Sequence, residues 1–224
     1  MKLFSFFKSE PKYNPIKEYT QEEFDKLKFK ARVAFVDDEE IAHVDRLKDD
    51  GYNIHTLSDI DNIDDFIRRK YHVVVLDIQG IGQNISPDSE GWGILRYLKK
   101  ECPNLVVIMY TGAEWSITKY KEDADLADDF IGKDMEFLDF KYQLDSGIKK
   151  AFSPEYHFEI EKKKISKHVA NASTVNQIKA ILENYGNDEK TAKKMIKKIT
   201  SNPAVLDSVD TFLSIIKQIK EVVA

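Results

Sequence analysis

Between residues 32 and about 150, short apolar runs alternate with amphipathic segments, and this alternation strongly limits the possible fold. Five runs have the length and composition of strands: RVAFV (32–36), YNIHTL (52–57), HVVVL (72–76), LVVIMY (105–110) and DDFIG (128–132). A helical pattern follows each of them. The alternation predicts an α/β fold with a doubly wound, five-stranded parallel sheet covered by helices on both faces. Right-handed crossovers place the carboxyl ends of all five strands at one edge.

The pattern changes near AFSPEYHF (151–158), beyond which no β pattern remains. Asp188 and Asn202 are suitable helix N-caps, and Pro203 suits a first helical position. Helices are expected over 155–170, 173–185, 188 to about 200, and from 203 onward. The sequence therefore predicts three parts: an N-terminal tail (1–30), an α/β domain (31–152) and a C-terminal all-helical domain (153–224).

The composition is that of a globular protein, with 42% hydrophobic and 33% charged residues in a chain of 224. Cys102 is the only cysteine, so no intrachain disulfide forms and a reducing, cytoplasmic location is expected. The aromatic cluster of residues 3–7 is too short for a signal peptide or a membrane span. We therefore expect no transmembrane segment, while the cluster itself suits a flexible or self-docked tail better than a membrane or partner contact.

Carboxylates end two of the predicted strands. The most apolar run, VVVL, stops on Asp77, and the first strand stops on Asp37 and Asp38. In the strand order expected for this alternation the first and third strands are neighbours, so the three carboxylates converge. Their mutual repulsion favours a divalent cation, and oxygen-only ligands favour Mg²⁺. The alternative interpretation of Asp77 alone is a loop cap.

Two further polar residues end strands at the same edge. The fourth strand ends in Thr111, followed by a glycine, and the fifth ends before Lys133. A lysine ammonium there pairs with a carboxylate or with a phosphoryl oxygen. Each of these residues alone has an ordinary explanation, as a cap, a core hydroxyl or a surface lysine, but chance does not readily bring all of them to one edge.

With these motifs, residues 31–150 resemble the receiver domain of two-component response regulators. FVDDEE matches the acidic pair, VVVLD the phosphoacceptor strand, MYTGA the hydroxyl strand and DDFIGK the lysine strand. The resemblance implies a flavodoxin-like receiver in a phosphorelay, acting in signal transduction as a phosphoprotein. It implies no enzymatic activity beyond self-phosphorylation from phosphodonors and slow self-dephosphorylation.

The resemblance also implies a role for each site residue. Asp77 accepts a phosphoryl group from a histidine kinase or phosphotransfer protein. Asp38 and Asp77 bind magnesium directly, and Asp37 binds it through water. The backbone carbonyl of Gln79 is a further ligand. Thr111 and Lys133 bond the phosphoryl oxygens, and Thr111 and Phe130 form the conformational switch.

Two features depart from the family pattern. The loop 78–91 is longer by about six residues and contains three glycines, and Asp134 replaces the usual proline after the lysine. Neither departure removes a catalytic group, so a degenerate, non-phosphorylated receiver that acts as a binding module is a secondary hypothesis. A magnesium-dependent phosphohydrolase is disfavoured because Gln79 stands where that class needs a second acid.

The helical domain leaves the output open. Residues 173–200 have the outline of a helix-turn-helix, with YGND as the turn and five lysines on the second helix. However, that helix opens with Asp188 and Glu189, and no arginine occurs after residue 151 to read guanine edges. We therefore favour a protein partner or self-association as the output, with a DNA-binding transcriptional regulator as the alternative.

Overall fold

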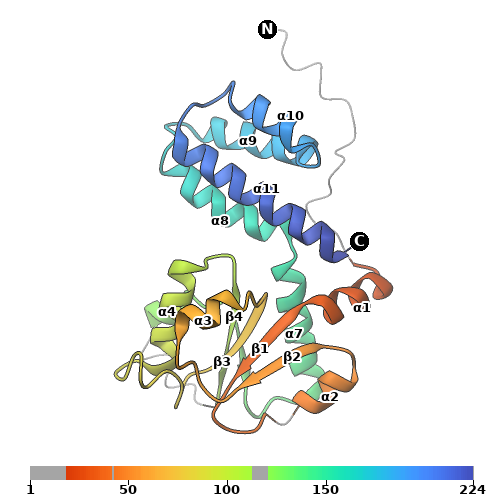
Figure 1. The fold of residues 1–224 in the computed structure, drawn as a ribbon, viewed down its shortest axis with the longest axis vertical. Coiled ribbons are helices and arrows are strands. Elements are labelled where there is room, and N and C mark those ends of the chain that lie inside the picture. The colour runs from red at the N-terminus through yellow and green to blue at the C-terminus, as the bar shows by residue number, and fades with distance from the viewer. Residues whose placement is uncertain (1–18, 42, 113–120, 224) are drawn as a thin grey trace. The chain divides into compact units, whose positions relative to one another are not determined.

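The computed structural model describes residues 19–41, 43–112 and 121–223 (Figure 1). The aromatic cluster at residues 3–7 lies outside them. The described chain divides into two compact units, Tyr19–Phe152 and Ser153–Val222. Each unit buries its own set of apolar side chains.

The first unit contains a parallel sheet in the order β2-β1-β3-β4-β5. The strands are β1 (Arg32–Val36), β2 (Asn53–Leu57), β3 (Val73–Asp77), β4 (Val106–Thr111) and β5 (Asp129–Gly132). Each lies within one residue of its predicted range. The predicted fold class is confirmed, because the sheet has five parallel strands and the central ones are buried on both faces.

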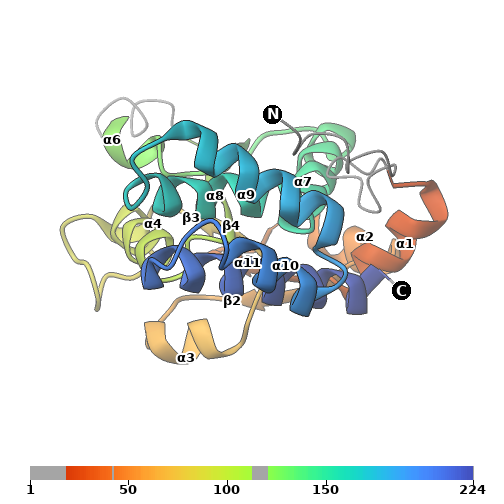
Figure 2. The same cartoon turned by 90° about the horizontal axis from the view of Figure 1, so that it is seen from above.

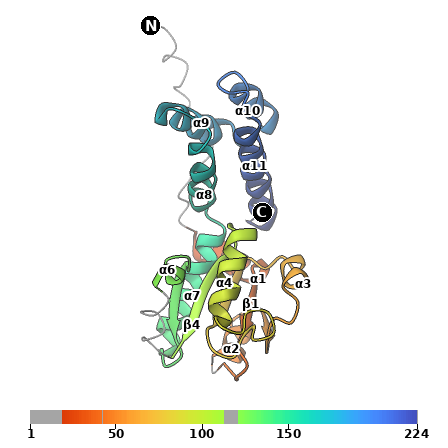
Figure 3. The ribbon, with the colours of Figure 1, turned by 90° about the vertical axis from the view of Figure 1, so that its left-hand side faces the viewer.

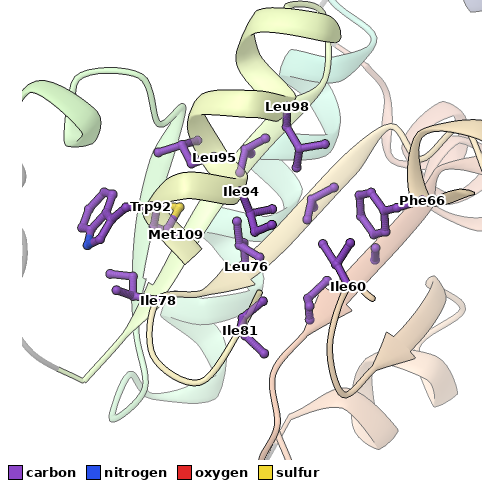
Figure 4. Packing of buried hydrophobic residues seen from close by; sticks show 14 of the residues in the cluster. Ile60, Phe66, Leu76, Ile78, Ile81, Trp92, Ile94, Leu95, Leu98 and Met109 are labelled. Carbon is purple, nitrogen blue, oxygen red and sulfur yellow. The ribbon is translucent and has the colours of Figure 1, made fainter. Parts of the chain in front are cut away.

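Helices cover both faces of this sheet. Those that follow the strands are α2 (Val44–Asp49), α3 (Ile63–Arg68), α4 (Glu90–Glu101), α6 (Lys121–Ala124) and α7 (Phe137–Ala151). On one face, Phe66 of α3 and Trp92, Leu95 and Leu98 of α4 pack in a single apolar cluster with Leu76 (Figure 4). On the other face, α7 stacks Phe140 on Phe35, with ring centroids 6.1 Å apart.

A helix that the sequence analysis placed in the tail precedes the sheet. Helix α1 (Gln21–Lys30) starts at a capping box in which Thr20 and Glu23 exchange hydrogen bonds. Its Phe24 and Leu27 are buried, and it contacts β2 and α7. The Tyr19 hydroxyl donates to the Phe152 carbonyl at 3.0 Å. The prediction of a tail through residue 30 was wrong for residues 21–30, which belong to the α/β unit.

The regular secondary structure of the second unit consists of helices alone among its described residues (Figures 2 and 3). Its helices are α8 (Pro154–Ser166), α9 (Ala172–Tyr185), α10 (Glu189–Ile196) and α11 (Pro203–Val223). Asp188 caps α10 and Asn202 accepts from Ala204 N–H at the start of α11, as predicted. Phe158 of α8 meets Phe212 of α11 edge to face at 5.7 Å. Among the helices described in either unit, none has the length and hydropathy needed to cross a membrane.

Candidate functional site

The strand register brings the three predicted carboxylates together. Val36 pairs with Leu76, so Asp37 and Asp77 follow at adjacent positions of neighbouring strands. Asp37, Asp38 and Asp77 each offer a carboxylate oxygen, and the three oxygens lie within 4.8 Å of one another. Asp37 and Asp77 are buried, while Asp38 is exposed. The cluster is therefore open to solvent on the Asp38 side.

Lys133 joins two of these acids. It is the first residue after β5, and its N–H donates to the Thr111 carbonyl at 3.0 Å. Its Nζ lies 3.0 Å from Asp37 Oδ2 and 3.1 Å from Asp77 Oδ2. Burial alone would lower the pKa of Lys133, but the hydrogen bonds to Asp37 and Asp77 outweigh it and raise the pKa. The lysine therefore stays charged.

The electrostatics of Asp77 differ from those of a surface acid. Burial raises the pKa of its carboxyl, and repulsion from Asp37 raises it further. The bond from Lys133 and the Ile78 N–H, which donates to Asp77 Oδ1 at 2.7 Å, oppose this only in part. One ammonium among three carboxylates leaves the cluster with excess negative charge, which a cation would neutralise.

Thr111 and Phe130 lie on the strands beyond Asp77. Asp77 pairs with Tyr110, so Thr111 lies one residue beyond it at the end of β4. Phe130 pairs with Met109 in the sheet and packs against Trp92 of α4, with centroids 6.4 Å apart. Trp115 lies outside the residues that the structure describes.

The long loop is folded into the domain. It runs from residue 78 to 89, and its Ile78 and Ile81 are buried in the cluster under α4 (Figure 4). Gly82 has φ +72° and donates its N–H to Asp59 Oδ1 at 2.6 Å. A Cβ added at Gly82 would lie 2.7 Å from Ile94 Cγ1, so this tight contact disfavours any larger residue at the position. The sequence analysis missed Asp59, since nothing near it in sequence indicates a long-range contact.

The residue after Gln79 lies against the acids. Gly80 has φ +77°, and a Cβ added there would lie 2.5 Å from Asp38 Oδ2. Its N–H donates to Glu90 Oε2 at 3.1 Å. Glu90 also escaped the sequence analysis, although it is the first residue of α4. The backbone of the loop thus borders the carboxylate cluster.

The residues present fit Mg²⁺ in their chemistry. The convergent donors are oxygens alone, two of them on buried carboxylates that share a single lysine. A cavity of about 340 Å³ adjoins them, lined in part by Asp37, Asp38, Glu39 and Asp45. An ion at the cluster would therefore be reached from solvent and would keep some of its water.

Comparisons with known proteins identify similar structures but no sequence family. No family model and no curated protein matches the chain. The receiver domain of NtrX from Brucella abortus is 27% identical, with a TM-score of 0.44, over 52% of this chain and 98% of that one. TrrA from Thermotoga maritima, solved with Mg²⁺ and beryllofluoride, is 22% identical, with a TM-score of 0.42, over 52% and 97%.

The chain is similar to response regulator receiver domains. A longer NtrX structure, in complex with ATP, is 24% identical over 70% of this chain, with a TM-score of 0.45, and the match spans 34% of that protein. The chemistry of the receiver-like unit (Tyr19–Phe152) follows from the positions of its own side chains.

Proposed function

We propose that this chain is a response regulator that accepts a phosphoryl group on Asp77 from a histidine kinase or phosphotransfer protein in the cytoplasm. The observation that carries the proposal is the bridge from Lys133 to Asp37 and Asp77 within the buried acid cluster. A structural ion pair needs one carboxylate for each lysine. A site that accepts a phosphoryl group needs surplus carboxylates for a metal and an ammonium for the incoming oxygens.

The residues have separable tasks in the transfer. An oxygen of Asp77 attacks the phosphorus, a P–O bond forms, and the P–N bond to the donor imidazole breaks. Its electron pair leaves with the nitrogen, which then takes a proton from solvent. Lys133 pairs with the phosphoryl oxygens as they approach, and the Thr111 hydroxyl binds one of them.

Magnesium would be held by Asp38, Asp77 and the Gln79 carbonyl, with Asp37 acting through water. When bound it would neutralise charge on the phosphoryl oxygens. The same residues favour slow hydrolysis of the acyl phosphate, because they leave the product open to water on the exposed Asp38 side. The protein would thus reset itself without a separate enzyme.

The output is assigned to the helical unit, through binding of a protein partner or self-association. Lys193 of α10 is paired with Glu189 at 2.6 Å and with Asp210 at 3.0 Å. These carboxylates reduce the positive field that a recognition helix needs to bind DNA phosphates. The absence of arginine beyond residue 96 of the sequence supports the same choice.

The proposal is tested by intact-mass analysis of the full chain after incubation with Mg²⁺ and a small-molecule phosphodonor. We expect the wild type to gain one phosphoryl group, and Asp77→Asn to gain none. Asp61→Asn, which changes an exposed acid that is not part of the cluster, is the matched control and should be modified like the wild type. Persistence of the added mass in Asp77→Asn, or its absence from the wild type, would reject the assignment.

A further inference from the structure

Glu90, the first residue of α4, has an unusual backbone conformation. Its φ is +45°, a left-handed value that a residue with a side chain adopts only under constraint. Lys70 is the one other such residue among those described, excluding glycine. Glycine would adopt this φ without strain. A glutamate at the position therefore suggests that its side chain makes a contact that compensates for the strain.

The side chain of Glu90 binds one backbone group in the long loop. Its Oε2 accepts the N–H of Gly80 at 3.1 Å, and its Oε1 lies 3.5 Å from Gln83 Nε2. The first contact is a charge-assisted hydrogen bond to a main-chain donor. Glu90 thus connects the start of α4 to the segment that directly follows Asp77.

The bond to Gly80 also fixes the carbonyl of Gln79. The two groups belong to one peptide unit, which is planar and trans, so its N–H and C=O point in opposite directions. Since the N–H points at Glu90, the Gln79 oxygen points away from Glu90. On its other side Gly80 lies against Asp38, with no room for a side chain. The peptide is therefore bound by the Glu90 carboxylate and lies beside a second carboxylate, Asp38, which belongs to the acid cluster.

We propose that Glu90 is a positioning residue for magnesium, orienting the Gln79 carbonyl through its hydrogen bond to Gly80 N–H. The inference rests on the proposed function, in which that carbonyl is a ligand. The φ of +45° places the Glu90 carboxylate where it reaches the loop. Groups that orient metal ligands in this way change metal affinity without touching the ion.

The test is a calorimetric titration of the full chain with MgCl₂, in the wild type and in three variants at Glu90. Glu90→Ala and Glu90→Gly remove the acceptor and should weaken Mg²⁺ binding about tenfold. Glu90→Gln keeps an oxygen that accepts the same hydrogen bond, and we expect it to stay within about threefold of the wild type. Lys70→Gly, which relieves the other left-handed residue, is the control and should bind Mg²⁺ as the wild type does.

Two further measurements separate positioning from loss of structure. Glu90→Gly relieves the strained φ, so its melting temperature without metal should equal or exceed that of Glu90→Ala. Hydrogen exchange of the Gly80 amide without metal should be faster in both of these variants and unchanged in Glu90→Gln. The proposal is overturned if Glu90→Gln loses as much affinity as Glu90→Ala, which would indicate a long-range charge effect, or if neither Ala nor Gly weakens binding.

Failure of this inference is distinguishable from failure of the proposed function. If Asp77 accepts no phosphoryl group while Mg²⁺ affinity still follows the pattern expected at Glu90, the positioning role stands and the phosphotransfer role falls. If Asp77 is phosphorylated but the Glu90 substitutions leave Mg²⁺ affinity unchanged, the phosphotransfer role stands and the positioning role falls. Asp38→Asn should abolish the Mg²⁺ signal in either case, which shows that the titration measures the acid cluster.

Discussion

The Trp92 indole packs against the Phe130 ring, with their centroids 6.4 Å apart and their planes inclined at 50°. Trp92 belongs to α4, and Phe130 belongs to β5, three residues before Lys133. This contact joins a fluorescent side chain to the residue that we assign to the switch. Any reorientation of Phe130 changes the surroundings of Trp92.

We therefore predict that Mg²⁺ with beryllofluoride changes the intrinsic fluorescence of a Trp115→Phe variant, in which Trp92 is the only tryptophan. Phe130→Ala in the same background should lose most of the response, because the ring that moves is gone. An unchanged spectrum in protein shown by mass or fluorine NMR to hold the fluoride would contradict the switch assignment.

Asp77→Asn should stabilise the metal-free protein. The pKa of Asp77 is raised by burial and by Asp37, so its ionised form is disfavoured in the folded state. Asparagine removes that charge and leaves Lys133 its partner Asp37. We expect the free energy of unfolding in urea with EDTA to rise by about 1 kcal/mol at pH 7. Added Mg²⁺ should raise the wild-type midpoint much more than that of the variant.

The contribution of Asp128 to the stability of the fold depends on pH. Its carboxylate bonds Lys99 and accepts from Val107 N–H at 2.8 Å, and Lys150 lies 3.0 Å away. Burial would raise the pKa of Asp128, but these partners outweigh it and lower the pKa. The stabilisation is therefore present above the ordinary carboxyl pKa of 3.8 and is lost as pH falls through the lower folded value.

At pH 7, Asp128→Asn should cost roughly 1.5–3 kcal/mol, because it removes hydrogen bonds to charged groups. The difference from the wild type should shrink in urea titrations below about pH 4. Asp65→Asn breaks an exposed ion pair with Arg68 and is the control, with less than about 1 kcal/mol lost at any pH. If Asp128→Asn lowers the free energy of unfolding by the same amount at every pH, the packing of the side chain and not its charge provides the stabilisation.

Gly91→Ala should destabilise the receiver-like unit by more than about 2 kcal/mol. An added Cβ would lie 2.2 Å from the Asp77 carbonyl oxygen and 2.8 Å from Ile78 Cα, which are backbone atoms that cannot turn aside. At Gly112 the nearest atom of the described residues would be Lys133 Cβ at 3.9 Å, so Gly112→Ala is the matched control. Circular dichroism melts of the two variants provide the comparison, and equal melting temperatures would refute the packing argument.

The full chain should bind duplex DNA weakly at most, without sequence preference. The exposed lysines of α10 and the turn after it, Lys190, Lys194, Lys197 and Lys198, give only a screened electrostatic attraction. Fluorescence anisotropy over a series of salt concentrations checks this. Tight, sequence-selective binding at physiological salt would instead favour a transcriptional regulator.

The strands and the acid cluster were predictable because they depend on local signals. Runs such as VVVL can be read without knowing their neighbours, and parallel connectivity brings Asp37 and Asp77 to the same edge. The helix caps at Asp188 and Asn202 could also be predicted from the sequence, since each depends on residues within three positions.

Other contacts were not predictable, because their partners are distant in the sequence. Asp59 meets Gly82 across 23 residues, and no periodicity links them. Glu90 has a left-handed φ and bonds Gly80 ten residues earlier, and helix propensity predicts neither feature. Helix α1 did carry a local signal, the Thr20 and Glu23 capping box, which the sequence analysis overlooked.

Helix α1 has a consequence for the order of events during synthesis. Tyr19 and Phe152, which share a hydrogen bond, are 133 residues apart, so α1 leaves the ribosome roughly 7–27 s before its partner exists. Helix α1, which carries Phe24 and Leu27, lacks its α7 contacts through that interval, and these two side chains are candidates for chaperone binding. Docking of α1 onto α7 would then be among the last steps in completing the unit, and a chain stalled before residue 137 would keep the helix exposed.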